Sequence, residues 1–408
     1  MKTINISHYR HDAVKYTENG QYFTHNFSDD FQIILLKPSD LETSKQALAT
    51  FAQVIIEYDI YWSHKHLSRN KKRLGIPIDK LSEYAERDEI HLKAIIYSIG
   101  SPQYQKVAPE RYEVTWNTVE LERVIKLAVV GSTNIEEFFF YATLLVGPTF
   151  IEHLTSFSSE VLHYKIAADL VGAKGWNSFE ELLSVATLCC DWLVLRNGEF
   201  LPNNFWGNDK DMDILCRDLA PFLLVINADR KGQGIANFYV TVEGQALDVD
   251  ARFLGDEYYD RAWQEDMLAT KVYQGVVPHL NIEHYFYSLL YHARIHKNVV
   301  KAIYVPRLRQ MAQVLELNFD EQILSHDQCF AQFIDAYFQR KTYQFTYPKD
   351  YACYENINRN VTRHITHVKA MSFNAEFTWR LFKNRIFLGV CKILPRSLKD
   401  KLKRVFNK

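Results

Sequence analysis

The chain has 408 residues, of which 47% are hydrophobic and 24% are charged, and its formal net charge is −1; this length suffices for two or three domains with a sizeable core. The near-zero charge excludes a global attraction to nucleic acid, and the longest apolar run, residues 138–151, is too short to span a bilayer. Because a signal-peptide segment is absent and the six cysteines lack C-x-x-C or metal-finger spacing, we expect free thiols in a cytoplasmic protein.

Residues 1–165 alternate strand-like and helix-like patterns, so we expect an N-terminal α/β region there. Residues 31–36 are typical of a strand, whereas residues 41–59 and 119–130 carry helical spacing. The basic run at residues 71–73 either contacts phosphate or is an exposed loop. No catalytic signature indicates a role for this region.

The pattern becomes more regular after about residue 175, where we expect a core domain that ends near residue 270. Residues 179–190 have helical spacing, and Asn177 or Ser178 is a candidate N-cap for that helix. The strands that we expect next are residues 192–195, 211–215, 237–242 and 247–253, with a helix or a further strand at residues 218–226.

Three aspartates stand in two of these strands. Asp211 and Asp213 are two residues apart and therefore point to the same face of their strand, and Asp250 can join them if the two strands pair. Clustered carboxylates repel one another unless a cation lies between them. Oxygen ligands of this kind suit Mg²⁺ or Mn²⁺, and Mg²⁺ commonly also holds substrate phosphates. We therefore expect a metal site for phosphoryl or nucleotidyl transfer at these three residues.

Tyr258, Tyr259 and Trp263 follow the second aspartate strand. Aromatic rings can stack on a base or a sugar ring, so these residues are candidate ligand contacts; the alternative is that they belong to the core. No basic strip flanks the aspartates, and we therefore expect no nucleic-acid substrate.

We expect residues 271–350 to form a helical domain, followed by a C-terminal segment at residues 351–408. His292 and His296 are four residues apart, so they share a face of a helix, and Lys297 follows them directly. The two histidines resemble half of a helical zinc site. They alternatively contact a substrate phosphate together with Lys297, or they pack in the domain.

The last part of the chain is strongly basic. Residues 380–408 contain ten cationic side chains and one acidic side chain, Asp400, and Phe, Leu, Ile and Val residues stand between them. This pattern is typical of amphipathic helices on an anionic membrane surface, so we expect a peripheral protein at the inner face of a membrane. The alternative is a helix that packs on its own domain with a basic outer face.

The core segment resembles the DNA polymerase β-like nucleotidyltransferase superfamily. The resemblance rests on Leu195–Gly198, Gly207–Leu215 with its Asp-x-Asp element, and Leu247–Arg252. Residues 192–202, 250–256 and 291–297 look more narrowly like nucleotidyltransferase-type proteins associated with bacterial capsule and cell-surface glycans. Residues 175–310, about a third of the chain, carry the resemblance.

The resemblance implies a nucleotidyltransferase-like mixed sheet and a Mg²⁺-dependent nucleotidyl- or phospho-transferase of surface polysaccharide synthesis. Asp211 and Asp213 would hold the metal at the donor phosphates, and Asp250 would share a second metal or act as a general base. Arg252 would neutralise charge on the transferred group. The residues expected to contact the nucleotide or sugar-phosphate substrate are Arg196, Asn197, Gly198, Lys210, Arg252, His292, His296 and Lys297.

The chain departs from the superfamily at one motif. A Gly-Ser pair normally precedes Asp-x-Asp and cradles a triphosphate, whereas this chain has Asn197, Gly198 and Glu199. Because glutamate repels phosphate, a diphosphate-linked or sugar-phosphate donor, bound partly by Arg196 and Lys210, fits better. Two alternatives stay open: an inactive scaffold or binding protein with the same fold, and a glycosyltransferase that uses a sugar nucleotide.

Overall fold

The structure is a computed structural model of the chain. It describes residues 13–16, 22–25, 31–77, 79–84, 87–99, 103–108, 111–115, 118–157, 159–207, 211–232, 234–297 and 300–369. The predicted substrate residue Lys210 and the predicted membrane-binding segment 380–408 lie outside these residues.

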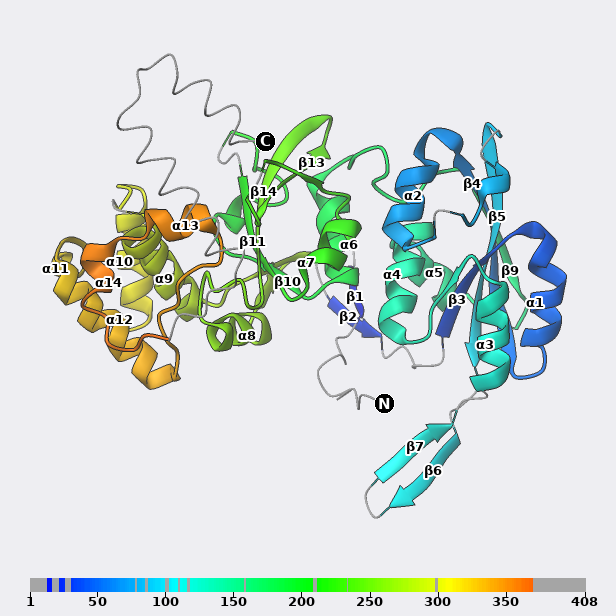
Figure 1. Ribbon diagram of the computed structural model, residues 1–408, viewed down its shortest axis with the longest axis horizontal. Coiled ribbons are helices and arrows are strands. Elements are labelled where there is room, and N and C mark those ends of the chain that lie inside the picture. The colour runs from blue at the N-terminus through cyan, green and yellow to red at the C-terminus, as the bar shows by residue number, and fades with distance from the viewer. Residues whose placement is uncertain are drawn as a thin grey trace, which may run out of the picture. The chain divides into compact units, whose positions relative to one another are not determined.

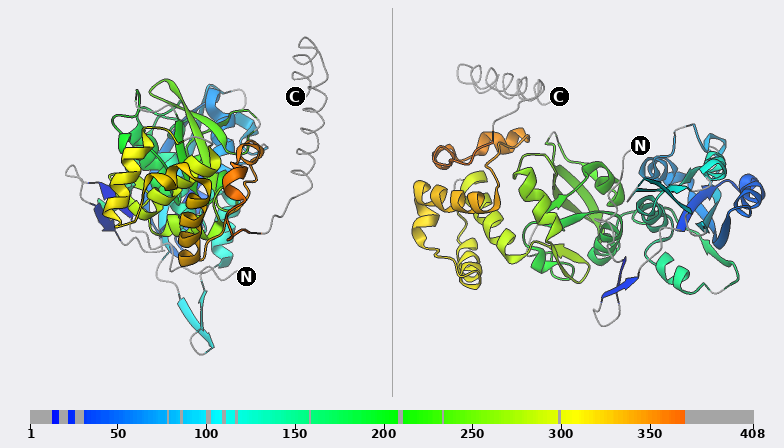
Figure 2. Two further views of the ribbon diagram at one scale, coloured as in Figure 1. Left: turned by 90° about the vertical axis from the view of Figure 1, so that its left-hand side faces the viewer. Right: turned by 90° about the horizontal axis from the view of Figure 1, so that it is seen from below.

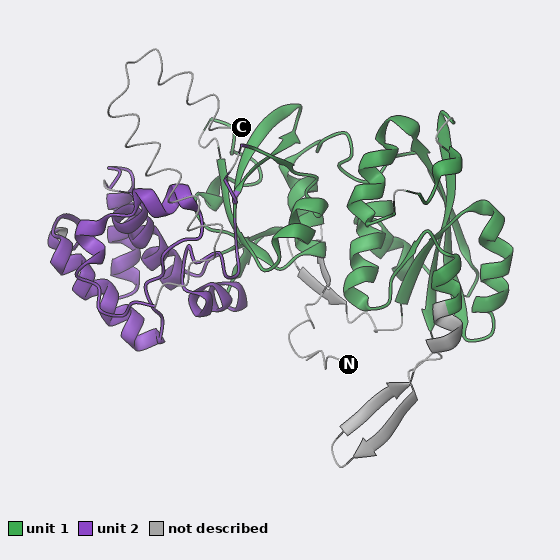
Figure 3. Ribbon diagram, in the orientation of Figure 1, with its two compact units in different colours: residues 1–231, 237–251, 271–279 green, residues 232–236, 252–270, 280–408 purple. Residues whose placement is uncertain are grey.

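Two compact units divide the chain (Figure 3). Unit 1 consists of residues 1–231, 237–251 and 271–279, and unit 2 consists of residues 232–236, 252–270 and 280–408. Residue 165, where we placed the end of the N-terminal region, lies within unit 1. The chain passes from unit 1 to unit 2 three times, after Lys231, after Ala251 and after His279.

The first sheet of unit 1 has five strands in the order β8-β3-β5-β4-β9, and Figure 1 labels β3, β4, β5 and β9 of this sheet. Strands β4 and β9 are parallel, and the other neighbours are antiparallel. The strands are β3 (Phe31–Leu36), β4 (Ala52–Ser63), β5 (Glu89–Ile99), β8 (Val130–Gly131) and β9 (Leu162–Ile166). The helices beside them are α1 (Leu41–Leu48), α2 (Leu67–Leu74), α3 (Thr118–Leu127), α4 (Ile135–Val146) and α5 (Phe150–Thr155). Two separate antiparallel pairs are β1 (Ala13–Tyr16) with β2 (Tyr22–His25), and β6 (Gln103–Ala108) with β7 (Arg111–Thr115).

Two predictions for this region need correction. The helix predicted over residues 41–59 ends at Leu48, and β4 begins at Ala52. The residues after Ala52 are mainly Val, Ile, Tyr and Trp, which favour a strand that has a partner on each side. The helix predicted over residues 119–130 is confirmed as α3, but Val130 belongs to β8. The strand at Phe31–Leu36 is confirmed.

The second sheet of unit 1 has seven strands in the order β12-β13-β14-β11-β10-β16-β15. Strands β10 and β16 are parallel, whereas β10 is antiparallel to β11, and β14 is antiparallel to β13. The strands are β10 (Trp192–Val194), β11 (Asp211–Cys216), β12 (Asp229–Arg230), β13 (Asn237–Val242), β14 (Gln245–Phe253), β15 (Val272–Gln274) and β16 (Val277–His279). All four core strands that we expected are confirmed.

Helices α6 (Phe179–Cys189) and α7 (Leu219–Val225) lie along one side of this sheet (Figure 1). The predicted N-cap is confirmed, because the Ser178 hydroxyl accepts a hydrogen bond from the Glu181 backbone N–H at 3.1 Å. The Glu181 carboxylate in turn accepts one from the Asn177 N–H at 2.7 Å. Such reciprocal caps satisfy N–H groups that the first turn of a helix leaves open.

Helix α2 connects the N-terminal region to this sheet through a buried arginine. The Arg73 guanidinium donates hydrogen bonds to the backbone carbonyls of Val171, Leu224 and Val225 at 2.6–2.8 Å. Two of these carbonyls end α7, where the helix leaves its last C=O groups without an internal partner. The loop interpretation of residues 71–73 was therefore wrong: they form the end of α2, and Arg73 is buried.

Unit 2 is mainly helical, and Figure 2 shows its helices from two further directions. The helical domain that we expected at residues 271–350 needs correction at its start, because residues 271–279 carry β15 and β16 and belong to unit 1. The helices are α8 (Arg261–Ala269), α9 (Ile282–Tyr291), α10 (Tyr304–Val314), α11 (Glu321–Ser325), α12 (Asp327–Lys341), α13 (Tyr351–Asn356) and α14 (Arg359–Thr362). A π-helical turn, His292–His296, follows α9 directly.

The fold is thus mixed α/β, with two mixed sheets in unit 1 and helices in unit 2. Within the described ranges, no helix has the length and apolar character required to cross a bilayer. The five cysteines in those ranges form no disulfide, and Cys391 lies outside them.

Candidate functional site

The predicted carboxylates lie on neighbouring strands. Strand β14, which carries Asp250, is the direct neighbour of β11 in the sheet, so the pairing of the two aspartate strands is confirmed. Along β11, Asp211 is exposed and Asp213 is half-buried, whereas Met212 and Ile214 between and after them are buried. Asp211 and Asp213 therefore share one face of the strand.

The other face of the sheet is the core that α6 and α7 cover. Trp192 of β10 lies opposite Cys216, and its ring centroid is 5.7 Å from that of Phe222 in α7. Leu247 and Val249 alternate with Asp248 and Asp250 along β14, and the apolar pair is buried while the acidic pair is half-buried. Helix packing on one face thus leaves a face that carries four carboxylates, which we call the acidic face: Asp211, Asp213, Asp248 and Asp250.

Arg196 holds the second aspartate of the Asp-x-Asp element. Its Nε donates to Asp213 Oδ2 at 3.0 Å and its Nη2 donates to Asp213 Oδ1 at 2.5 Å. The two side chains are only 5% and 13% exposed, so the pair is largely removed from water. Bidentate pairs of this kind are strong, because two charge-assisted hydrogen bonds share one geometry. Both oxygens of Asp213 are therefore engaged by a cation of the protein itself.

The turn after β10 brings Arg196 to this place. The Leu195 N–H donates to the Asp213 carbonyl at 2.9 Å, which extends the β10–β11 pairing by one residue. Asn197 has a left-handed backbone with φ of 56°, and a 3₁₀ turn, Gly198–Phe200, follows it. Asparagine tolerates this conformation better than most residues. Asn197 therefore allows the chain to reverse its direction at this point.

Asp248 has a different environment from the other three carboxylates. It pairs with Lys231, and both side chains are about half exposed. It lies opposite Tyr239 on β13, whereas Asp250 lies opposite Asn237. Asp248 is therefore a surface ion pair on the same face, next to the position that we predicted as catalytic.

The predicted contacts that belong to unit 2 gather around Tyr258. The Arg252 guanidinium carbon is 4.1 Å from the centroid of the Tyr258 ring, and the His296 ring centroid is 3.8 Å from it. The Tyr258 hydroxyl lies 2.9 Å from Nδ1 of His292. All four side chains are buried, and Asp350 accepts a hydrogen bond from Arg252 Nη1 at 3.3 Å. Arg252, His292 and His296 thus form one buried cluster, the Tyr258 cluster.

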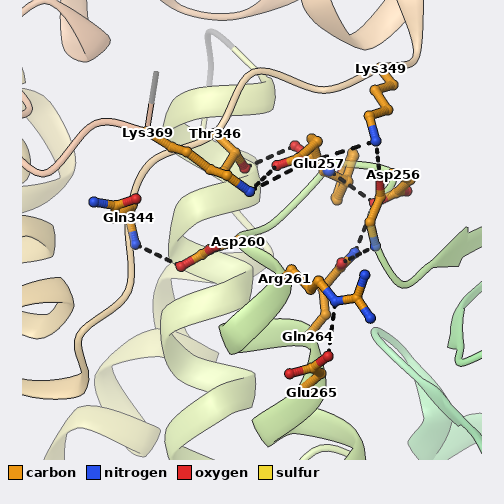
Figure 4. Close-up of polar contacts among 12 residues, drawn as sticks. Asp256, Glu257, Asp260, Arg261, Gln264, Glu265, Gln344, Thr346, Lys349 and Lys369 are labelled. Carbon is orange, nitrogen blue, oxygen red and sulfur yellow. Dashed lines mark hydrogen bonds and ion pairs between the residues drawn. The ribbon is translucent and has the colours of Figure 1, made fainter. Parts of the chain in front are cut away.

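A network of hydrogen bonds surrounds the turn that precedes Tyr258, and Figure 4 shows its members Asp256, Glu257, Gln264, Thr346 and Lys349. The buried Asp256 accepts hydrogen bonds from the Tyr258 N–H at 2.9 Å and from Gln264 Nε2 at 2.8 Å. Lys349 donates to the Gly255 carbonyl at 2.6 Å, and Thr346 donates to the Glu257 carbonyl at 2.9 Å. The segment from β14 to α8 is thereby attached to residues 344–350. Lys297, the remaining predicted contact in unit 2, is exposed beyond the π-helical turn.

The donor chemistry of the acidic face fits Mg²⁺ or Mn²⁺ in part. Mg²⁺ is commonly held by one or two carboxylates together with substrate phosphates, and Asp211, Asp213 and Asp250 supply carboxylates on adjacent strands. In the described part of the chain, however, no three His, Cys, Asp or Glu residues are grouped closely enough to hold an ion. An ion at Asp213 would either share the carboxylate with Arg196, since each oxygen has a second lone pair, or take the place of Arg196.

Comparisons of the chain with protein-family models, with curated proteins and with solved structures gave no match. The sequence left one residue of interest between two roles and missed another. Tyr258 was predicted either as a ligand contact or as a core residue, and it is buried at the centre of the Tyr258 cluster. His279, at the end of β16, was not predicted at all. In the sequence, His279 is only a histidine at the end of a three-residue apolar segment. Such a segment is too short to be predicted as a strand from its pattern.

Proposed function

We propose that the chain is a Mg²⁺- or Mn²⁺-dependent transferase of a phosphorus-containing group, either a nucleotidyl- or a phospho-transferase with a nucleotidyltransferase-like core. The observation that carries this proposal is the placement of Asp211 and Asp213 on one face of β11, next to the strand of Asp250. The residues that resemble proteins of bacterial surface-glycan synthesis support a nucleotide or sugar-phosphate substrate there, and residues 380–408 support a site of action at a membrane surface.

Arg196 would change partners during substrate binding. A guanidinium pairs with carboxylates and with phosphates in the same bidentate geometry, so a donor phosphate can replace Asp213 as its partner. Asp211 and Asp213, with Asp250 beside them, would then hold the metal, which would neutralise charge on the transferred group. Asp250 would accept the proton of the attacking hydroxyl. The positive charge of Arg196 also offsets the repulsion that Glu199 exerts on a phosphate.

Calorimetric titration with Mn²⁺ and Mg²⁺ tests this proposal, with protein alone, with a nucleoside triphosphate and with a sugar nucleotide. We expect Asp213→Asn and Asp250→Asn to weaken metal binding at least tenfold in the presence of nucleotide. Asp248→Asn is the matched control, because Asp248 is on the same strand and face as Asp250 but pairs with Lys231. Equal binding by Asp250→Asn and Asp248→Asn would contradict the proposed site.

The Arg196–Asp213 pair favours a second candidate, a binding or scaffold protein that keeps the fold without catalysis. A cation of the protein then permanently replaces the metal at Asp213. This candidate predicts no metal binding in any of the titrations, and it predicts that Arg196→Gln alone creates metal affinity by leaving Asp213 without its partner. Metal binding by the unchanged chain in the presence of nucleotide would exclude it.

A further inference from the structure

His279 lies beneath the turn that carries Arg196. Strand β16 runs parallel to β10, with His279 opposite Val194, so the imidazole is at the same sheet edge as the start of the turn. A Cβ atom added to Gly198 would stand 2.3 Å from Cε1 and 2.4 Å from Nδ1 of His279. No real Cβ contact is that short, so the ring occupies the space that any side chain at residue 198 would need.

Close approach to the ring is also the reason for glycine at residue 198. Glycine often serves a left-handed backbone, but Gly198 is not among the glycines of this chain with positive φ. The other use of glycine is a close approach of the backbone to another group. The packing of the turn against the His279 ring therefore explains why residue 198 is a glycine.

His279 is half-buried at the end of β16. Within the described residues, its Nε2 atom is buried and has no hydrogen-bond partner. Burial lowers the pKa of His279, and the negative charge of Glu199 acts in the opposite direction. A buried polar atom of this kind calls for an explanation, because native folds satisfy nearly all of them. The packing of the ring against Gly198 leaves Nε2 unsatisfied, so the ring keeps this position at a cost, which indicates that its contact with the turn is needed.

We infer that His279 is a positioning residue: its ring fixes Gly198, and through Gly198 it fixes the place from which Arg196 reaches Asp213 or a phosphate. The inference rests on the proposed function for the identity of the ligand, which is a diphosphate-bearing molecule bound at Arg196. Arg196 is two residues before Gly198, with the reversed backbone of Asn197 between them. A shift of Gly198 therefore moves Arg196, whose bidentate contact requires a fixed approach.

A double-mutant cycle tests the inference, since coupling between two contacting residues appears as non-additivity. The variants are Gly198→Ala, His279→Ala and the double variant, with His279→Phe to keep the ring and remove its nitrogens. The first measurement is the NMR signal of the Arg196 Nε–H, which reports the ion pair without any ligand. The second is the affinity for inorganic pyrophosphate in the presence of Mg²⁺.

We expect Gly198→Ala to shift the Arg196 signal and to weaken pyrophosphate binding at least tenfold. His279→Ala should weaken binding about fivefold, His279→Phe less than threefold, and the double variant should lie closer to the unchanged chain than Gly198→Ala does. His153→Ala is the control, because His153 is another partly buried histidine of unit 1 whose pKa burial lowers; it should leave the Arg196 signal unchanged.

An unshifted Arg196 signal in Gly198→Ala would overturn the inference. The His279 ring would then have rotated away from the new methyl group while the backbone at residues 196–198 stayed in place. Strictly additive effects of the two alanine variants would overturn it as well. If the unchanged chain does not bind pyrophosphate, the proposed ligand fails, while the Arg196 signal still decides whether His279 positions the turn.

Discussion

At the residue scale, Tyr258 and Tyr259 form a matched pair for a mutational test. Both rings are buried, but their hydroxyls differ: that of Tyr258 is 2.9 Å from His292 Nδ1, and that of Tyr259 is 3.4 Å from the Ser288 carbonyl. Tyr258→Phe keeps the contacts of the ring and leaves the buried His292 nitrogen without the hydroxyl. We expect it to lower the free energy of unfolding by about 1–2 kcal/mol, measured by urea denaturation.

Tyr259→Phe should cost less than about 0.5 kcal/mol, because a 3.4 Å contact is at the limit of a hydrogen bond. Equal costs for the two variants would show that the Tyr258–His292 contact adds nothing beyond the packing of the ring.

A second residue-scale prediction concerns pH. His284 is buried, and Trp263 donates to its Nδ1 at 3.1 Å. Burial lowers the pKa of His284 below its usual value of 6.5, and the charges of Asp266 and Glu283 offset this in part. The unfolded chain then binds the proton more readily than the folded chain. Stability is therefore complete above about pH 6.5 and falls as the pH decreases below it.

Thermal denaturation of the unchanged chain and of His284→Gln at pH 7.5 and pH 5.5 measures this effect. The unchanged chain should lose more stability between the two pH values than the variant, because the variant lacks the titrating ring. An identical pH dependence of the two proteins would contradict a role for His284.

The sequence predicted the position of a single residue correctly where the alternation of side chains along one strand was enough to decide it. Asp211 and Asp213 share a face because side chains alternate along a strand, and this alternation needs no knowledge of the fold. The bond between Arg196 and Asp213 depends on a chain reversal at Asn197 and on the pairing of β10 with β11. His279 reaches Gly198 only because β16 lies beside β10. Neither contact has a signal in local sequence.

At the element scale, N-cap residues and side-chain alternation predicted helices and strands correctly. Helical spacing over long segments predicted them less accurately. Asn177 and Ser178 were the two candidate N-caps of α6, and Ser178 is the N-cap that the structure shows; the alternation of β13 and β14 identified both strands. The helix predicted at residues 41–59 was correct as far as Leu48 and wrong beyond it, because residues 55–58 of β4 are buried in succession and show no strand period. The π-helical turn at His292–His296 was equally invisible, since its sequence continues the helical pattern of α9.

The contact between α2 and α7 provides an element-scale prediction. Arg73→Leu removes the guanidinium that satisfies three backbone carbonyls, and we expect a loss of about 2–4 kcal/mol in the free energy of unfolding. The neighbouring Lys72 is exposed on the same helix, so Lys72→Leu is the matched control and should change stability by less than about 0.5 kcal/mol. Urea denaturation compares the two, and equal losses would mean that Arg73 does not attach α2 to α7.

At the scale of the whole molecule, the sequence divided the chain into consecutive segments, but it did not predict the two compact units of the structure. The boundary near residue 165 follows a change of pattern, yet Arg73 bonds α2 to carbonyls that are about a hundred and a hundred and fifty residues further along the chain. Contacts at such separation are set by tertiary packing, which no local pattern reports. Unit 2 likewise contains residues that precede β16 in the sequence, 252–270, and residues that follow it, 280–408. A division into consecutive segments cannot predict such a unit.

The segment 380–408 carries the last prediction, which rests on its sequence because it lies outside the described residues. Each cation near an anionic bilayer contributes about 1 kcal/mol, and buried apolar side chains add to this. The full chain should therefore sediment with anionic vesicles and not with zwitterionic vesicles. Its binding should weaken as salt rises, because screening shortens the reach of the surface charge. Replacing Lys399, Lys401, Lys403 and Arg404 by glutamine should weaken binding strongly, whereas equal sedimentation of a chain truncated before Arg380 would show that another surface holds the membrane.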